Sequence, residues 1–270
     1  MASVTKPYPG TQSILRAVSL LKAFDDEHPE WSLSQLARKV DLNKTTAFRL
    51  LSALESEGLI ARNNSGDNYI LGPEIVVMGG HALRSNSLRA VSRVELERLA
   101  STTGETASLE IMTGTEMLII DEVVGDHLVS GVRSIGTRWP VHGASTGLAL
   151  LAFWPADDLD AFLQNPLAGI ASKTITDPAE LRQLLVQIVE QGYAVADEML
   201  EMDLVAIGAP LVDYNSCAVG AVSIYGPKSR IVQERVVEIG ELVRDAAVRI
   251  SDRLGYRSGR LSSDLEPFPI

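Results

Sequence analysis

Three stretches in the first sixty residues repeat apolar positions every three or four residues, the spacing of one face of an α-helix. The second begins with a capping box, because the Gln35 side chain can reach back to the amide of Ser32. The third begins at Asn43, a good N-cap, and ends near Gly58. The pattern predicts helices over residues 11–24, 32–40 and 43–57. The inward residues would be Ile14, Ala17, Val18, Leu21 and Phe24 in the first helix, Leu33, Leu36, Ala37 and Val40 in the second, and Ala47, Leu50, Leu51 and Leu54 in the third.

A hairpin is predicted next along the chain. Two short strand-like runs flank the turn-rich residues 63–67, a pattern typical of two strands joined by a tight loop. Gly72 and Pro73 then interrupt any regular element. We therefore expect a first domain over residues 10–72, followed by a linker helix over residues 73–86.

The rest of the chain alternates strand-like and helical runs, which is typical of an α+β or mixed domain. We place this domain at residues 87–256 and interpret residues 257–270, which are polar and contain proline, as a flexible tail. In a helix expected over residues 88–101, the inward residues would be Val91, Val94, Leu96 and Leu99. The other expected elements are strands over residues 106–112, 117–124, 128–132, 193–198, 206–213 and 218–225, and helices over 147–153 and 231–254 and beginning at Asp157 and Asp177.

Composition narrows the class of protein. The chain has 270 residues, of which 46% are hydrophobic, so it can form a real core and is not wholly disordered. Its longest apolar run, residues 148–154, is far shorter than the roughly 20 residues that cross a bilayer. The first residues lack the apolar run of a secretory signal, so we expect a soluble cytoplasmic protein with no membrane partner. The single cysteine, Cys217, is interpreted as a plain loop thiol, with a redox role as the alternative.

A basic segment lies within a chain whose net charge is −11. Residues 31–52 carry four basic side chains and one acidic side chain, a local charge of +3. Two short helices joined by a three-residue turn, with Lys44 and Arg49 near the start of the second, form an arrangement that reads the DNA major groove. The following hairpin would then be a wing on the neighbouring phosphate backbone, although these polar groups are also compatible with ordinary solvated faces. The residues expected to contact DNA are Gln35, Arg38, Lys44, Thr45, Thr46, Arg49, Arg62 and Asn64.

Several segments resemble one protein family. Residues 33–39, 42–60 and 69–72 are similar to the winged helix-turn-helix of the IclR family of bacterial transcription regulators. The similarity continues in family order to about residue 255, through residues 136–152, 191–198, 207–211 and 219–227. The resemblance implies a GAF-like C-terminal domain that binds a small organic effector. It also implies dimers through the N-terminal part and the linker helix, often paired into tetramers, on palindromic double-stranded operator DNA.

The resemblance further implies an effector pocket between the loop 143–146 and facing strands. Family members commonly carry aspartate at the position of Ala196 and cysteine at that of Ala206, and their loss predicts a roomier, more apolar cavity for a bulky ligand such as an aromatic acid or amide. Met112, Trp139 and Met199 would be walls of this cavity or ordinary core residues. Glu110, in a predicted strand, is expected to face outward, and the alternative is a pocket group that favours a hydrogen-bond donor on the ligand. The expected effector-binding residues are Met112, Trp139, Gly143, Ala144, Ser145, Thr146, Ala196, Ala206 and Ser223.

An enzymatic interpretation is also open. Gly143, Ser145 and Gly147 match the Gly-x-Ser-x-Gly elbow of α/β-hydrolases, but no histidine follows Ser145 to act as its base. The sequence has no zinc-ligand or nucleotide-binding glycine spacing, so we expect no metal and no cofactor. We therefore expect a ligand-controlled, sequence-specific DNA-binding regulator rather than an enzyme. The alternatives are a small-molecule sensor whose winged helix contacts proteins, and a hydrolase that uses Ser145.

Overall fold

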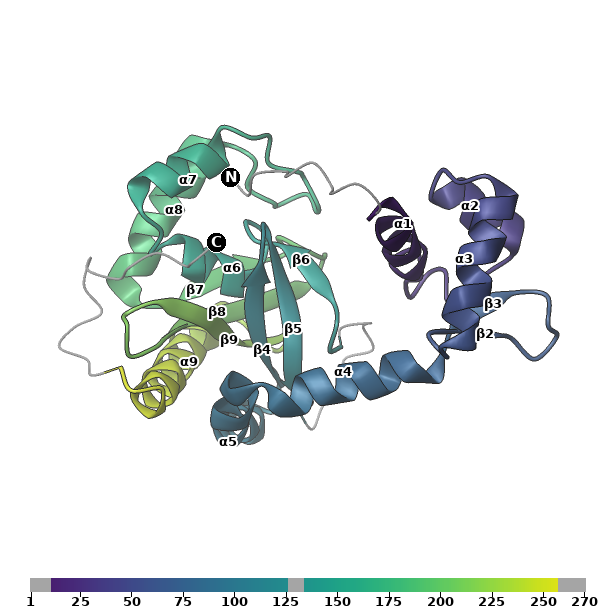
Figure 1. Cartoon of the computed structure of the whole chain (residues 1–270). Helices are drawn as coiled ribbons and strands as arrows, with labels where there is room; N and C mark the ends of the chain where they lie inside the picture. The colour runs from purple at the N-terminus through teal and green to yellow at the C-terminus, as the bar shows by residue number, and fades with distance from the viewer. Residues whose placement is uncertain (1–10, 126–133, 257–270) are drawn as a thin grey trace. The chain divides into compact units, whose positions relative to one another are not determined.

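The computed structural model describes residues 11–125 and 134–256 (Figure 1). The chain divides into two compact units, Met1–Ser85 and Asn86–Ile270. The α+β class predicted from the sequence is confirmed. The strand expected over residues 128–132 and the tail expected over 257–270 lie outside the described residues. Within the described part, no helix is both long and apolar enough for a bilayer crossing.

The first unit packs its first three helices against a small antiparallel sheet with strand order β1-β3-β2, and a fourth helix follows the sheet. Its buried residues include Leu20, Leu36, Leu51, Ile60 and Tyr69. The helices are α1 (Gln12–Leu21), α2 (Leu33–Lys39), α3 (Lys44–Ser56) and α4 (Pro73–Ser85), and the strands are β1 (Glu30–Trp31), β2 (Ile60–Arg62) and β3 (Tyr69–Leu71).

The local signals at the start of α2 and α3 operate as the sequence predicts. The Gln35 amide donates to Ser32 Oγ over 3.4 Å, and the Ser32 amide donates to Gln35 Oε1 over 3.1 Å, which completes the capping box. Asn43 Oδ1 accepts from the Thr46 amide at 2.8 Å. Between the helices Asp41 adopts a left-handed backbone conformation, with φ of 53°, so the chain turns sharply from α2 into α3.

The inward face predicted for the first helix is partly wrong. Ile14 is 63% exposed and Val18 is also exposed, whereas Leu20 and Ala23 are buried. The helix ends at Leu21, because the chain then turns and places Ala23 in the core. A helical apolar pattern therefore marks two faces of α1: one packs inside this unit, and the other is left open.

The second unit is built on a six-stranded sheet with strand order β6-β5-β4-β9-β8-β7, in which all neighbours are antiparallel. Helices α5 and α9 cover one face and α6 covers the other (Figure 1). The strands are β4 (Thr106–Thr113), β5 (Glu116–Val123), β6 (Arg138–Pro140), β7 (Ala194–Asp197), β8 (Leu204–Val212) and β9 (Ala218–Pro227), and the helices are α5 (Ser87–Thr103), α6 (Ser145–Leu151), α7 (Ala156–Leu163), α8 (Pro178–Gln191) and α9 (Gln233–Arg253).

The inward face predicted for α5 also needs correction. Val94 is 61% exposed, while Glu95 is buried beside Leu96. Glu95 accepts hydrogen bonds from Arg249 Nε and Arg253 Nη2 of α9, each at 2.9 Å, and these two arginines neutralise it. Because a paired carboxylate occupies the inward position, the apolar side chain next to it points to solvent.

Strand β5 contains a β-bulge, which determines which of its residues face α6 and which face α5. Strand β4 pairs Leu109 with Asp121 but Glu110 with Ile119, so Ile120 is an extra residue on β5. Because of this insertion, Ile119 shares the α6 face with Glu110, whereas Asp121 faces α5 together with Leu109. Simple alternation along β5 would place Ile119 and Asp121 on the same face.

Candidate functional site

The expected DNA-contacting residues gather at the start of α3 and on the neighbouring α2. Lys44, Thr45 and Arg49 are exposed on α3, and Thr46 is half-buried in its first turn. Gln35 and Arg38 are exposed on α2, and Asn64 is exposed in the wing between β2 and β3. Phe48, which the sequence reasoning did not single out, is 49% exposed on α3. A surface groove lined by Ser13, Thr46, Arg49 and Leu50 runs between α1 and α3.

Arg62 lies at the base of the wing. Its guanidinium carbon is 3.8 Å from the centre of the Tyr69 ring, and its Nη2 donates to the Tyr69 hydroxyl at 2.6 Å. Its Nε is also 3.5 Å from Glu55. Burial of the Tyr69 ring raises the pKa of its hydroxyl, although the positive charge of Arg62 opposes this shift. Arg62 therefore supports the wing structurally, and a DNA contact from it remains a prediction.

A pocket opens on the α6 face of the large sheet, with about 270 Å³ of unfilled space that includes its open mouth. It is lined by Glu110, Ile119, Trp139, Ala144, Ser145, Thr146, Leu200, Ala206, Ser223 and Tyr225. Trp139, Ala144, Ser145, Thr146, Ala206 and Ser223 are thus brought together as the sequence suggested. Met112 instead packs against the core, and Ala196 pairs with Ala206 across β7 and β8. Gly143 lies where an added Cβ would be 2.8 Å from the Leu200 side chain.

Glu110 takes the alternative position, in the pocket, and the outward orientation expected from the sequence is wrong. It is only 5% exposed and lines the pocket instead of facing outward. Ser108 Oγ donates to its Oε1 at 2.9 Å, and Thr146 Oγ1 donates to its Oε2 at 2.6 Å. Helices cover both faces of the sheet, so β4 has no solvent face that could receive the carboxylate.

The size and the polarity expected for the cavity stay predictions. Two alanines do replace polar family residues, but a buried carboxylate and hydroxyl groups supply polarity from β4, β9 and α6. The sequence signal available for this was the alternation of Ser108 and Glu110 along one strand face.

The segment between β7 and β8 closes one side of the pocket through Leu200. Its ends, Glu198 and Asp203, both have left-handed backbone conformations, with φ of 57° and 62°. Glu198 accepts hydrogen bonds from Lys173, from the Asp203 amide at 2.9 Å and from Lys228 at 2.9 Å. These donors, Lys173 foremost, lower the pKa of Glu198 to about 2. The segment is therefore held in place by charge as well as by packing.

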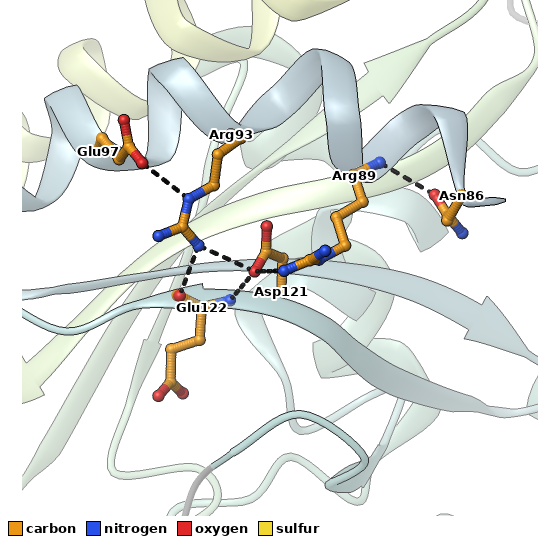
Figure 2. A network of polar contacts seen from close by, with 6 residues as sticks. All are labelled: Asn86, Arg89, Arg93, Glu97, Asp121 and Glu122. Carbon is orange, nitrogen blue, oxygen red and sulfur yellow. Dashed lines mark hydrogen bonds and ion pairs between the residues drawn. The ribbon is translucent and has the colours of Figure 1, made fainter. Parts of the chain in front are cut away.

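The opposite face of the sheet carries a second buried carboxylate, which the sequence reasoning missed (Figure 2). Asp121 is 1% exposed, and its Oδ1 accepts from Arg89 at 3.2 Å, from Arg93 at 3.1 Å and from the Glu122 amide at 3.0 Å. Figure 2 shows both arginines extending from α5 towards β5, with Glu97 bound to the far side of Arg93. The available signal was the four-residue spacing of Arg89 and Arg93, which places both on one face of α5.

The hydrolase interpretation gains no support from the geometry. Ser145 is buried in the first turn of α6. His142 Nε2 lies 2.9 Å from the carbonyl oxygen of Ala168, and its ring is tilted against Phe162, with 6.5 Å between the ring centres. His142 is thus engaged with the chain around Ala168, while His127 lies outside the described residues. A serine nucleophile needs a base hydrogen-bonded to its hydroxyl, and His142 is directed elsewhere.

Comparison with known proteins places both units in one family. Residues 13–64 match the IclR helix-turn-helix domain, and residues 80–252 match the C-terminal domain of the bacterial transcriptional regulator IclR. The HTH-type transcriptional regulator KipR of Bacillus subtilis is 30% identical over 246 residues, which cover 91% of this chain and 98% of KipR.

Solved structures agree with the sequence matches. An IclR transcriptional regulator from Alicyclobacillus acidocaldarius has a TM-score of 0.81 and 27% identity, covering 90% of this chain and 98% of that one. An IclR homologue from Microbacterium hydrocarbonoxydans, complexed with 4-hydroxybenzoate, has a TM-score of 0.78 and 28% identity, covering 90% of this chain and 99% of that one. The resemblance inferred from the sequence is confirmed. The chain belongs to the IclR family of bacterial transcriptional regulators, with a DNA-binding helix-turn-helix domain followed by an effector-binding domain.

Proposed function

We propose that the protein reads a palindromic operator through α3 and that a small, single-ring organic effector controls its operator affinity. The pocket on the α6 face carries the effector part of this proposal, because Trp139 and Tyr225 supply aromatic walls beside buried polar groups. The homologue complexed with 4-hydroxybenzoate supports a ligand of this size. Thermodynamic linkage then requires that the effector changes the affinity for the operator by the same factor as the operator changes the affinity for the effector.

Exposed apolar side chains support a dimer formed through the first unit. Ile14, Leu15 and Val18 are exposed on α1, and Val76 and Met78 are exposed on α4. Apolar side chains gathered on single helices are typical of surfaces that a partner covers. Two-fold symmetry would place paired α3 helices in successive major grooves, roughly 34 Å apart or a multiple of that distance. Pairing of such dimers into tetramers is part of the same proposal.

The remaining assignments follow from this function. Residues 10–72 would be the DNA-binding domain, 73–86 the linker helix and 87–256 the effector domain. A regulator of chromosomal operators works in the cytoplasm and needs no catalytic activity of its own.

Fluorescence anisotropy tests the DNA-binding part. The full-length protein is titrated against the intergenic DNA beside its own gene and against a scrambled duplex, each at two salt concentrations. We expect tighter binding to the native fragment, weakened by salt because phosphate contacts release counterions. Equal, weak binding to both duplexes would instead favour a sensor whose winged helix contacts proteins.

A further inference from the structure

One carboxylate joins strand β1 to both ends of the wing, residues 63–68 between β2 and β3. Glu30 lies on β1, beside β3. Its Oε2 accepts from Asn63 Nδ2 at 2.9 Å, and its Oε1 accepts from Asn68 Nδ2 at 3.2 Å. Asn63 directly follows β2 and Asn68 directly precedes β3, so the contact holds both strands where they enter the turn. These three residues are called the wing clamp below.

The orientation of the Asn63 side chain is fixed by contacts within the wing. Its Oδ1 accepts from the Asn68 backbone amide at 3.3 Å and from Ser65 Oγ at 3.0 Å. Because the oxygen is occupied there, the Nδ2 group is the end that is directed to Glu30. The Asn63 carbonyl oxygen also accepts from the Gly66 backbone amide at 2.9 Å. Asn63 thus links the turn to Glu30, and the direction of the wing depends on the clamp.

The wing has little positive charge of its own. Residues 63–68 include no lysine or arginine and one acidic side chain, Asp67. Arg62, just before the wing, stacks on the Tyr69 ring, and its Nε lies 3.5 Å from Glu55 Oε1. Attraction between charges acts over several ångströms and tolerates a loose geometry, whereas a hydrogen bond weakens steeply when its angle is poor. A wing that contacts DNA through uncharged groups therefore needs a fixed direction.

We propose that Glu30 is a positioning residue for operator binding: it holds the wing so that residues 64–66 hydrogen-bond to the DNA backbone beside α3. These residues are exposed at the turn. Without the clamp, ordering the turn on DNA would cost conformational entropy that the clamped protein has already lost. The charge of Glu30 alone has the opposite effect, because a carboxylate repels phosphate. The inference rests on the proposed function, since it takes the first unit as the reader of the operator.

Two alanine variants separate the clamp from the charge. A duplex that the full-length protein selects from a random library serves as the operator, and fluorescence anisotropy gives its affinity at two salt concentrations. Glu30→Ala should weaken binding about three- to tenfold relative to Glu27→Ala, the effect of losing one or two neutral hydrogen bonds. Glu27 is the matched control because it is an exposed carboxylate in the loop before β1. The factor should be the same at both salt concentrations, because uncharged groups release no counterions from DNA.

Hydroxyl-radical footprinting of the same complexes locates the loss on the DNA. We expect the wild-type protein to protect sugars at the α3 sites and at flanking positions, and Glu30→Ala to lose only the flanking protection. Asn68→Ala keeps the carboxylate and removes one of the two clamp bonds, so it should show a smaller loss. Combined with Glu30→Ala it should add nothing further, because both variants disrupt the same contact. Asn68→Ala also carries the test if Glu30→Ala does not fold.

Four outcomes would overturn the proposal. The first is that Glu30→Ala and Asn68→Ala bind the duplex as tightly as Glu27→Ala, and the second is a loss of affinity with the flanking protection intact. The third is a loss of flanking and α3 protection together, which would mean a general disruption of the first unit. The fourth is a wild-type footprint without flanking protection.

The selection step distinguishes this inference from the proposed function. If the full-length protein enriches no duplex, sequence-specific operator binding fails, and the role of the clamp fails with it. If a duplex is enriched and the variants at positions 30 and 68 bind it like the control, only the clamp fails and the operator reading by α3 stands.

Discussion

Replacing Asp121 by alanine should strongly destabilise the C-terminal unit. Its carboxylate is buried, and its Oδ1 is the shared acceptor of Arg89, Arg93 and the Glu122 amide (Figure 2). Hydrogen bonds to charged groups contribute about 1.5–3 kcal/mol each and neutral ones about 1 kcal/mol. Arg89 and Arg93 are 30% and 41% exposed, so solvent screening reduces each of their bonds to about 1–1.5 kcal/mol.

The sum is a loss of about 3–4 kcal/mol, within the 3–5 kcal/mol typical of breaking a buried ion pair by removing one partner. For a unit of this size each kcal/mol moves the melting temperature by about 2–4 °C, so the transition should fall by roughly 10 °C. Asp121→Asn keeps the shape of the side chain and its acceptor oxygen but loses the charge, so it should lower the free energy of unfolding by about half as much. Differential scanning calorimetry of the full-length protein measures both.

Asp160 supplies the control. It also pairs with an arginine, Arg182, but both side chains are exposed, so Asp160→Ala should cost less than about 1 kcal/mol. The reasoning would be refuted if Asp121→Ala cost under 1 kcal/mol, or if the two alanine variants melted at the same temperature. Either result would mean that the desolvation cost of Asp121 cancels its hydrogen bonds.

Three further predictions concern DNA, acid and ligand. Arg49→Ala should weaken operator binding by about 1–3 kcal/mol, measured by anisotropy, and relax the sequence preference at one base pair. An equal loss of affinity for random DNA would show that Arg49 contacts only phosphate. The pKa of Glu198 is lower in the folded protein than in the unfolded chain, so its carboxylate stabilises the fold above pH 4.5 and loses this effect as the pH falls towards 2. In Glu198→Gln the free energy of unfolding should therefore depend less on pH between these values. An unaltered pH dependence would contradict the assignment. Ala206→Asp should weaken effector binding measured by calorimetry and preserve operator binding without effector, and an unchanged effector affinity would mean that position 206 is not in the effector site.

Local signals made most of the first unit predictable. Ser32 with Gln35, and Asn43, determine where α2 and α3 begin through contacts within a few residues, so the sequence alone contains the information. The open face of α1 was not predictable in the same way. Apolar periodicity identifies a buried stripe, but it does not separate a stripe covered within the unit from one such as that of Ile14 and Val18, which remains exposed.

Buried carboxylates account for most of what the sequence reasoning missed in the second unit. Glu95, Glu110 and Asp121 occupy core positions because donors from segments far away in sequence reach them. Hydropathy assigns such residues to the surface, and the partners are known only once the strands are ordered. Six of the expected pocket residues could be placed together because the family resemblance supplied the long-range contact that periodicity does not.

The extra residue in β5 has a consequence for redesign of this domain. Because Ile120 has no partner on β4, it separates the two faces of the sheet: Ile119 belongs to the ligand side and Asp121 to the side of α5. Deleting Ile120 would make Ile119 and Asp121 adjacent, and regular alternation would then keep them on opposite faces, whereas straightening the strand with Ile120 in place would put both on the same face. Both the pocket and the arginine pair on the other face therefore depend on how β5 accommodates Ile120, so a redesign of the pocket must either keep the bulge or remove Ile120 together with it.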